Sequence, residues 1–263
     1  MLKLTNVFKT FNIGTINEKR ALDDVNLVLN DGDFVTVIGG NGAGKSTLQN
    51  VISGSIIPDF GKIEINDIDI TKLPEYKRAK YIGRVFQDPM LGTASDMWIE
   101  ENLALALKRG EKRSPFKWMI SANEETSFKE QLFKLGLNLE DRMKTKVKLL
   151  SGGQRQAITL LMATIKKPEL LMLDEHTAAL DPKTASLVLN LTKEIVETEK
   201  ITTLMITHNM KDALEYGNRL IMMDQGRIIF DVSNNEKKKL TVEDLLKKFS
   251  ETKDAPSDSM VLS

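Results

Sequence analysis

The stretch Gly39-Gly40-Asn41-Gly42-Ala43-Gly44-Lys45-Ser46 decides the fold of this chain. It matches the pattern G-x-x-x-x-G-K-[ST] and follows a continuous β-prone apolar run, Phe34–Ile38. Glycines let backbone N–H groups approach phosphate oxygens without obstruction by a Cβ, and a helix that begins at the loop adds partial positive charge. A merely flexible glycine-rich turn would not explain the Lys and the hydroxyl, so we predict a phosphate-binding loop (P-loop) between a buried strand and a helix.

This loop predicts ATP and Mg²⁺ as cofactors. Lys45 is expected to reach the β- and γ-phosphates, and the hydroxyl of Ser46 is expected to ligate Mg²⁺. The cofactor-binding residues predicted in and beside the loop are Gly39, Asn41, Gly42, Ala43, Gly44, Lys45, Ser46 and Thr47.

Apolar runs elsewhere in the chain predict the sheet around this loop. They recur at 170–173, 201–207 and 220–223, and helix patterns such as 182–198 lie between them. The first thirty residues alternate as antiparallel strands do, before a turn at Asp31-Gly32. We predict an α/β fold: a P-loop NTPase core with a mixed sheet and an N-terminal antiparallel β subdomain.

A helical pattern replaces the strand pattern from about residue 88 to 150. Helical periodicity at 100–109 and 124–135 is joined by a basic stretch at 108–117, which indicates an inserted α-helical subdomain. After residue 232 the chain becomes polar, then offers a short amphipathic helix at 242–249 and a Ser/Asp/Pro tail expected to be disordered. The predicted division is an ATPase domain over 1–235 and a short helix with a flexible tail over 236–263.

Composition excludes several classes of function. Lys+Arg 37 against Asp+Glu 37 gives formal net charge +0, so we expect no nucleic-acid partner. Zero Cys excludes a disulfide framework and thiol chemistry, and two histidines disfavour a histidine metal site. No apolar run approaches the ~18 residues that span a bilayer. The N-terminus has no apolar signal segment either, so the chain is expected to be neither secreted nor membrane-spanning.

A pair of acids follows the apolar run at 170–173. Asp174 is placed to hold Mg²⁺, usually through water, and Glu175 to polarise an attacking water as general base. Two acids at a strand end are alternatively solvated turn residues, but a P-loop in the same chain favours the catalytic interpretation.

The segment Leu150-Ser151-Gly152-Gly153-Gln154 admits two interpretations. Ser-x-x-Gln before an amphipathic run is a capping box at a helix start. A glycine-rich helix N-terminus with a Ser hydroxyl is also an anion site, and both interpretations can hold together.

LSGGQ, the P-loop and LLMLDE occur in an order that resembles the ATP-binding subunits of ABC transporters, and the resemblance covers residues 2 to about 232. It implies that Gln87 is the Q-loop glutamine that contacts Mg²⁺ and the γ-phosphate side, and that His208 is the switch histidine. It also implies that Phe11 stacks on adenine and that Ala179-Leu180-Asp181 is the D-loop. Ser151, Gly152, Gly153 and Gln154 become nucleotide-binding residues by the same resemblance.

Each of these positions has a structural alternative. A Phe in a β segment is by default a core residue, and His208 alone would be an ordinary core or surface histidine. Asp181 followed by Pro182 also suits a helix N-cap with Pro at the first helical position. One departure from the family pattern is His176, which stands where members commonly carry Pro. A His can hydrogen-bond and titrate there, or it simply fits the loop.

The resemblance also implies how the protein works. Two subunits pack head to tail as a homodimer, with ATP between the P-loop of one and the LSGGQ of the other. The dimer docks on separate transmembrane permease subunits at the cytoplasmic side of the cell membrane, as a peripheral motor that hydrolyses ATP to drive transport. A separate ATPase chain is typical of bacterial importers that work with a solute-binding protein, and DEHTAALDP with LTVEDLLKKF suggests uptake of an amino-acid-like solute.

Three alternatives remain at this stage: an exporter ATPase, a soluble ABC-type ATPase acting on ribosomes or DNA, and a small P-loop kinase. The kinase leaves LSGGQ and Gln87 unexplained. The 64 positions between Gln87 and Ser151 (151 minus 87) are too few for the long coiled-coil insertion of many soluble members.

Trp98 stands where the related family segment usually has a small or polar residue. It either fills the core of the helical subdomain or lies on the groove around 87–107 that receives the membrane subunit. Asp96, Glu100 and Glu101 would form a polar rim around an aromatic anchor, so we favour docking.

Overall fold

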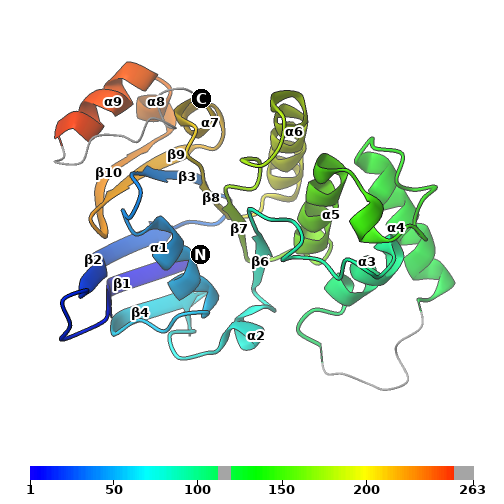
Figure 1. The fold of residues 1–263 in the computed structure, drawn as a ribbon, viewed down its shortest axis with the longest axis horizontal. Helices are drawn as coiled ribbons and strands as arrows, with labels where there is room; N and C mark the ends of the chain where they lie inside the picture. Colours follow the sequence, from blue (N-terminus) through cyan, green and yellow to red (C-terminus); the bar gives the residue numbers. More distant parts are fainter. Residues whose placement is uncertain (112–119, 252–263) are drawn as a thin grey trace.

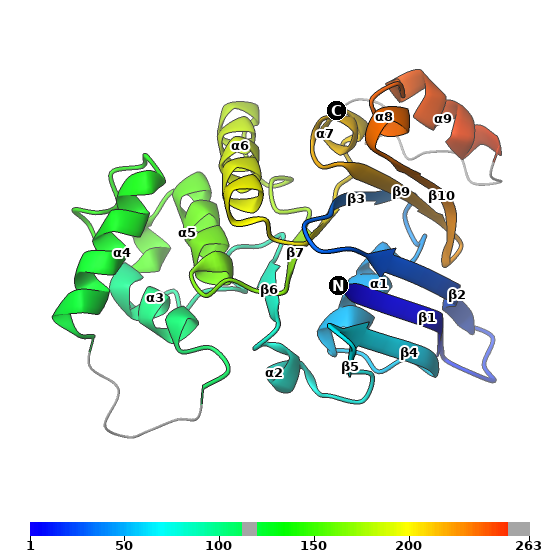
Figure 2. The same cartoon turned by 180° about the vertical axis from the view of Figure 1, so that it is seen from behind.

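The computed structural model describes residues 1–111 and 120–251, which form two lobes (Figures 1 and 2). One lobe contains both β-sheets. The other contains α3 (Ile99–Leu107), α4 (Ala122–Lys134) and α5 (Gly152–Thr164). Helix α6 (Pro182–Glu199) lies beside α5, between the sheets and the other helices.

The central sheet has six strands in the order β10-β9-β3-β8-β7-β6. Strands β6, β7, β8, β3 and β9 run parallel to one another, whereas β10 pairs antiparallel with β9. The mixed sheet expected for a P-loop core is therefore confirmed. The strands are β3 (Phe34–Gly39), β6 (Ile82–Val85), β7 (Leu170–Asp174), β8 (Thr203–Ile206), β9 (Arg219–Asp224) and β10 (Arg227–Ser233).

The N-terminal sheet is antiparallel with the order β2-β1-β4-β5, as predicted. Its strands are β1 (Leu2–Phe11), β2 (Lys19–Leu29), β4 (Phe60–Ile65) and β5 (Ile68–Asp69). Strand β1 shifts register with β2 between Leu4 and Thr10, and its last residue, Phe11, pairs with Lys19. This hairpin end lies beside the P-loop, so both residues reach the same cavity.

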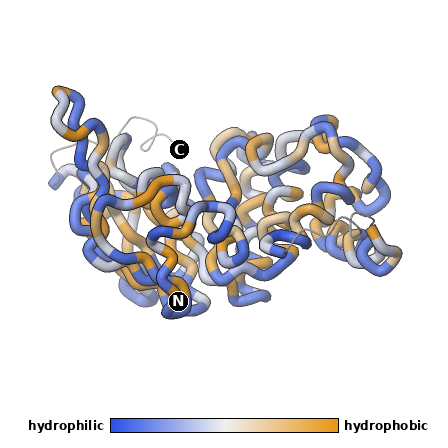
Figure 3. Tube along the Cα trace, turned by 90° about the horizontal axis from the view of Figure 1, so that it is seen from below, coloured by the Kyte–Doolittle hydropathy of each residue, from blue (hydrophilic) through white to orange (hydrophobic). Residues whose placement is uncertain are grey.

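Apolar side chains fill three buried clusters. The first cluster lies among the inserted helices, α5 and β7. The second joins the two sheets through α1 (Lys45–Ser53). The third lies under α7 (Met210–Glu215) and α9 (Val242–Glu251). Figure 3 shows the hydrophobic segments gathered inside the lobes and hydrophilic turns at their surface. Lobe formation therefore follows from burial of apolar area.

The described part of the segment 88–150 contains α3, α4 and η1 (Val147–Leu149) and no named strand. The basic stretch predicted at 108–117 extends into residues 112–119, which lie outside the described residues. The tail predicted to be disordered also lies outside them from residue 252 on.

The polar segment after residue 232 is more ordered than its composition suggests. Strand β10 continues to Ser233, and α8 (Asn234–Lys237) follows directly. Lys237 is only 2% exposed and donates to the carbonyl oxygens of Tyr216 and Gly217. A surface lysine would be the ordinary expectation here, but its three N–H donors satisfy carbonyls just beyond α7, and burial lowers its pKa to about 8.

Arg78, at the end of α2 (Glu75–Arg78), connects the P-loop helix to the chain that follows β5. The side chain is fully buried and donates to the carbonyl oxygens of Val51 and Ile52 at 2.7 and 2.8 Å. It also donates to those of Thr71 and Leu73 at 2.8 and 2.7 Å. One guanidinium thus satisfies the carbonyl end of α1, whose other end begins at the P-loop.

We predict that Arg78→Met lowers the free energy of unfolding by about 3 kcal/mol or more, because it leaves several buried carbonyls without donors. Urea unfolding followed by circular dichroism measures this change. The matched control is Arg20→Met, since the Arg20 side chain is 62% exposed and its pair with Asp23 should contribute at most about 1 kcal/mol. Equal effects of the two substitutions would contradict the role of Arg78.

Candidate functional site

The functional motifs meet at one edge of the central sheet because their strands are parallel neighbours. The register places Val37 of β3 opposite Ile206 of β8, and Ile206 opposite Asp174 of β7. The carboxyl ends of these strands therefore face the same side, as the ligand sites of open α/β sheets require. The P-loop follows β3, Glu175 follows β7 and His208 follows β8.

A cavity of about 280 Å³ lies at this edge. Its walls come from the P-loop, the β1–β2 hairpin and the turns after β7 and β8. The lining residues are Phe11, Lys19, Ala21, Asn41, Gly42, Ala43, Gly44, Lys45, Ser46, Thr47, Glu175 and His208. Most of the residues predicted to bind the cofactor are thus together, whereas Gly39, Gln87, Asp174 and residues 151–154 do not line this cavity.

The turn into α1 requires glycine. Gly44 has φ 103°, and a Cβ on it would lie 2.5 Å from the carbonyl oxygen of Ala21. Lys45 is the first residue of α1, and its buried ammonium donates to the carbonyl oxygens of Gly39 and Gly40 at 2.6 and 3.1 Å. Burial lowers the pKa of Lys45, while the carboxylates of Glu175 and Asp174 oppose that shift. The P-loop therefore holds the Lys45 ammonium close to its own backbone N–H groups and to the exposed hydroxyl of Ser46.

Glu175 and His208 form the contact that faces the P-loop. Glu175 Oε1 lies 2.5 Å from His208 Nε2. The backbone N–H of Glu175 donates to the carbonyl oxygen of Ile206 at 3.0 Å, and its φ of 44° is in the left-handed region that non-glycine residues seldom adopt. Pairing with β8 thus fixes the backbone of Glu175, while the His208 imidazole fixes the Glu175 carboxylate.

Asp174 lies one residue before, at the end of β7. Burial raises its pKa, and the Arg84 guanidinium at 3.8 Å opposes the rise. Arg84 also donates to Asn50 Oδ1 of α1 at 2.9 Å, so it connects the two cofactor-binding elements. Sequence reasoning did not identify Arg84, because an arginine within a short strand carries no motif signal.

Mg²⁺ was predicted at Ser46, Gln87 and Asp174. In the described ranges, 1–111 and 120–251, no group of three or more His, Cys, Asp or Glu could hold a metal. An exposed Ser hydroxyl and one carboxylate suit Mg²⁺, which keeps waters and takes phosphate oxygens as ligands. Gln87 follows β6, whose Val85 pairs with Leu173 of β7, so it lies at the same edge, but its side chain is exposed.

The LSGGQ segment lies on the other lobe. Ser151 Oγ accepts from the N–H of Gln154 at 3.3 Å, and Gln154 Oε1 accepts from the N–H of Ser151 at 3.2 Å, which confirms the predicted capping box. Ser151 and Gly152 are exposed, and a Cβ on Gly152 would contact Leu180 in the predicted D-loop. The first N–H groups of α5 therefore lie at a helix start whose Ser151 and Gly152 are exposed.

Asp181 caps the start of α6 as Ser151 caps the start of α5. Its Oδ1 accepts from the N–H of Thr184 at 3.1 Å, and Pro182 is the first residue of α6, which confirms the predicted N-cap.

Phe11 is half-buried and lines the cavity, so its packing differs from that of a core Phe. Lys19 lines the same cavity and was missed by sequence reasoning. A Cβ on Gly42 would lie 2.9 Å from Lys19 Nζ, so this ammonium lies directly against the P-loop. A lysine in a solvated strand gives no such signal, because only the pairing of β1 with β2 brings it there.

Comparison with known proteins decides the family. A family model described as "ABC transporter" matches residues 22–178. The chain belongs to the ABC transporter family. It is 46% identical to the "Tyrosine transport ATP-binding protein" of Clostridioides difficile (strain R20291), over 95% of this chain and 98% of that protein.

Solved ABC cassettes have the same fold. One is the dimeric post-hydrolysis state of the ATP-binding cassette MJ0796 bound to ADP and Pi, with a TM-score of 0.75, 30% identity and coverage of 89% and 98% of the two chains. Another is cbiO1 from Clostridium perfringens, part of the ABC transporter complex cbiONQ, with a TM-score of 0.75, 25% identity and coverage of 95% and 94%.

These findings confirm the family and the fold, and this ABC cassette is an ATP-binding ATPase subunit of importer-like type. None of the helices in the described residues is long and apolar enough to cross a membrane.

His176 of this cassette packs in the interior. It is 2% exposed, and its Nε2 lies 3.1 Å from Thr192 Oγ1. That hydroxyl donates to the carbonyl oxygen of Val188 at 2.8 Å, so His176 Nε2 carries the proton and donates to Thr192. Burial lowers the pKa of His176 to about 4, which keeps the ring neutral at physiological pH.

This burial predicts a pH effect on stability. The folded-state pKa is depressed, so the contribution of neutral His176 is complete above pH 6.5 and is lost as the pH falls toward 4. Between pH 7 and pH 5 the loss should be about 2 kcal/mol, and His176→Gln should remove it. Urea unfolding at both pH values measures the difference. The same pH slope in both proteins would show that His176 does not titrate on unfolding.

Phe11 yields a second prediction. Phe11→Ala should weaken ATP binding by roughly 1 to 3 kcal/mol, the range for a base stacked on an aromatic ring, with little change in melting temperature. Titration calorimetry and thermal unfolding measure the two effects. The control is Phe128→Ala, since Phe128 is 1% exposed and its loss should cost about 3 to 5 kcal/mol of stability without weakening ATP binding. A Phe11 variant that unfolds early but binds ATP normally would assign Phe11 to the core.

Proposed function

We propose that this chain is the motor subunit of a bacterial uptake system for an amino-acid-like solute. It would act as a homodimer, docked from the cytoplasmic side on separate transmembrane permease subunits that receive solute from a solute-binding protein. The 46% identity to a protein named for tyrosine transport supports the solute class. The presence of cbiO1 in a multi-subunit transporter complex supports the separate permease.

The homodimer is supported by one observation: two motifs expected to contact the nucleotide lie apart from each other in a single chain. The P-loop cavity contains no residue of LSGGQ, whose Ser151 and Gly152 are exposed on the other lobe. A second copy in head-to-tail orientation would place its LSGGQ against the first copy's ATP, and the reverse contact would follow by symmetry. The dimeric cassette with ADP and Pi supports this arrangement.

Within each site, different residues of this chain would bind the phosphates and catalyse hydrolysis. Lys45 and the N–H groups of the P-loop bind and orient the phosphates, and Glu175 accepts a proton from the attacking water. His208 holds the Glu175 carboxylate through the 2.5 Å contact. Bound Mg²⁺, held by Ser46 and Asp174, would neutralise phosphate charge.

Hydrolysis then changes the dimer. ATP bound between two copies is an interfacial anion that both the P-loop and the LSGGQ helix N-terminus contact. Loss of phosphate removes some of those charge-assisted contacts and weakens the interface. Closing and opening of the dimer would move the attached membrane subunits.

We predict that Glu175→Gln lowers kcat at least about 100-fold, because the amide keeps the shape and the His208 contact but cannot accept the proton. ATP binding should persist, and an ATP-bound dimer should accumulate. Phosphate release and size-exclusion chromatography with Mg-ATP measure these effects.

The matched control is Glu197→Gln on the exposed face of α6, which should hydrolyse ATP at the wild-type rate. A Glu175→Gln protein that stays monomeric and retains wild-type kcat would contradict both the catalytic assignment and the dimer mechanism.

A further inference from the structure

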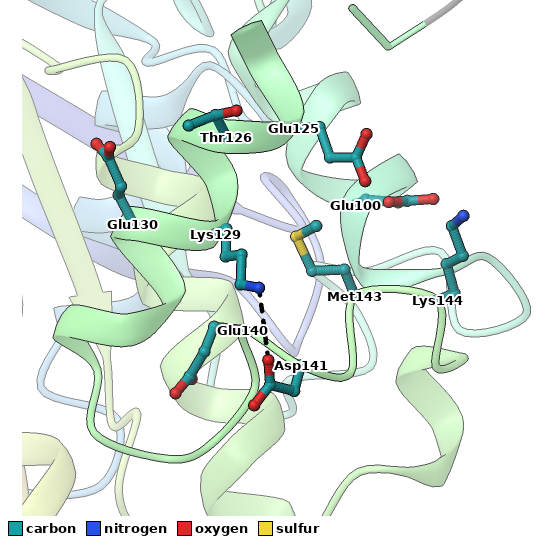
Figure 4. Close-up of a pocket in the computed structure, with 9 residues that line it drawn as sticks. All are labelled: Glu100, Glu125, Thr126, Lys129, Glu130, Glu140, Asp141, Met143 and Lys144. Carbon is teal, nitrogen blue, oxygen red and sulfur yellow. Dashed lines mark ion pairs between the residues drawn. The ribbon is translucent and has the colours of Figure 1, made fainter. Parts of the chain in front are cut away.

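The chain departs from the family pattern at two residues, Trp98 and His176. Trp98 is 40% exposed, so it is not a core residue. Glu100, predicted to form part of a polar rim around Trp98, is instead 7% exposed and lines a cavity of about 440 Å³ in the helical lobe (Figure 4). The rim prediction is therefore wrong for Glu100. His176 is the departure that lies next to the nucleotide site.

Glu175 and His176 are consecutive, but their side chains lie on opposite sides of the turn after β7. Glu175 lines the P-loop cavity, whereas His176 is 2% exposed and contacts α6. The left-handed φ of Glu175, 44°, costs free energy in a residue with a Cβ, and such a conformation persists only where neighbouring contacts hold it. The contacts on both sides of Glu175 therefore decide where its carboxylate lies.

Two attachments flank the Glu175 backbone. Before the turn, the N–H of Glu175 donates to the carbonyl oxygen of Ile206 in β8 at 3.0 Å. After it, the N–H of Ala178 donates to the Glu175 carbonyl oxygen at 3.0 Å, but this bond lies within the turn and attaches it to no other element. The His176 side chain makes that attachment, because its Nε2 lies 3.1 Å from Thr192 Oγ1 in α6.

Thr192 is a well-fixed acceptor for this imidazole. Its side chain is 1% exposed, and its hydroxyl donates to the carbonyl oxygen of Val188, one helical turn earlier, at 2.8 Å. The hydroxyl hydrogen is thus committed, and a lone pair remains for His176. Water is excluded from a contact buried in this way, so it does not compete for either partner. The turn after Glu175 is therefore attached to α6, which packs on α5 (Figure 1).

Proline would constrain residue 176 in a different way. Its ring fixes φ near −65°, and its side chain can make no hydrogen bond. Histidine leaves that dihedral free, so holding one conformation of the turn costs more conformational entropy. In this chain the hydrogen bond from His176 to Thr192 offsets that cost and holds the turn.

We propose that His176 is a positioning residue for ATP hydrolysis: its hydrogen bond to Thr192 attaches the turn after Glu175 to α6 and so holds the Glu175 carboxylate at the attacking water. His208 contacts the carboxylate itself, and His176 holds the backbone that carries it. Displacing a catalytic group by about 1 Å can cost on the order of 100-fold in rate. This inference rests on the proposed function, in which Glu175 is the general base.

The test removes the hydrogen bond from the α6 side without changing the shape of the side chain. Thr192→Val should lower kcat about tenfold, because Glu175 is less well held, while the Kd for ATP changes less than about twofold. Phosphate release and titration calorimetry measure the two effects. The matched control is Thr202→Val, which removes another buried hydroxyl, one that accepts from the N–H of Gly32 at 3.0 Å just before β8. This control should hydrolyse ATP at the wild-type rate.

Two further variants separate positioning from packing. His176→Leu removes the donor and should lower kcat by a similar factor, and adding Thr192→Val should lower it no further, since both changes remove the same bond. Thr192→Ser is the conservative variant. It should recover most of the rate lost in Thr192→Val because it keeps the hydroxyl, although loss of a buried methyl lowers its melting temperature.

A wild-type kcat in Thr192→Val would overturn the proposal. Equal losses of kcat in Thr192→Val and Thr202→Val would overturn it as well, because they would show an effect of stability alone. The proposed function is tested separately by Glu175→Gln. An inactive Glu175→Gln beside a fully active Thr192→Val would refute this inference alone, whereas a wild-type rate in Glu175→Gln would refute the proposed role of Glu175 and this inference with it.

Discussion

The parallel alignment of β3, β8 and β7 is the constraint on which the nucleotide site depends. Because Val37, Ile206 and Asp174 share one register line, the P-loop, His208 and Glu175 must emerge at the same edge. These residues therefore lie close together in space although they are far apart along the chain. A slip of one strand would move Glu175 away from His208 and reverse its buried side chains. The apolar runs of these strands, buried on both faces, prevent that slip.

Much of this site could be predicted from the sequence because its residues occur in short motifs next to strand ends. The P-loop, Glu175 and the caps at Ser151 and Asp181 need only local spacing and local hydrogen bonds. Lys19 and Arg84 could not be found in this way. Each is a charged residue in a strand, and the contact that brings it to the site, Lys19 with Gly42 and Arg84 with Asn50, joins chain segments more than twenty residues apart. Sequence periodicity describes which face of a strand is buried, but it does not identify what lies across from that face.

The same limit explains why the sequence does not indicate the burial of Lys237 and Glu100. Both stand in polar stretches whose composition predicts solvent exposure, and both are more than nine-tenths buried. Lys237 finds two carbonyl oxygens beyond α7, so its burial is compensated within the chain. Glu100 instead lines a cavity between α3 and α4, where burial raises its pKa and Lys144 opposes the rise. Only the contacts around each group, which depend on tertiary structure, distinguish a structural charge from one available to a ligand.

The two lobes therefore differ in how completely they satisfy their own polar groups. The sheet lobe holds Lys45 on the carbonyl oxygens of Gly39 and Gly40 and Glu175 on His208, so both side chains are already positioned beside the P-loop cavity. The helical lobe presents the exposed start of α5 and a cavity between α3 and α4 that is lined by the carboxylates of Glu100, Glu125, Glu130, Glu140 and Asp141. Replacing one of these carboxylates by an amide should stabilise the isolated chain, since repulsion among like charges opposes folding. The polar groups that the helical lobe leaves accessible at the start of α5 are therefore the ones that the proposed contact with a second copy would use.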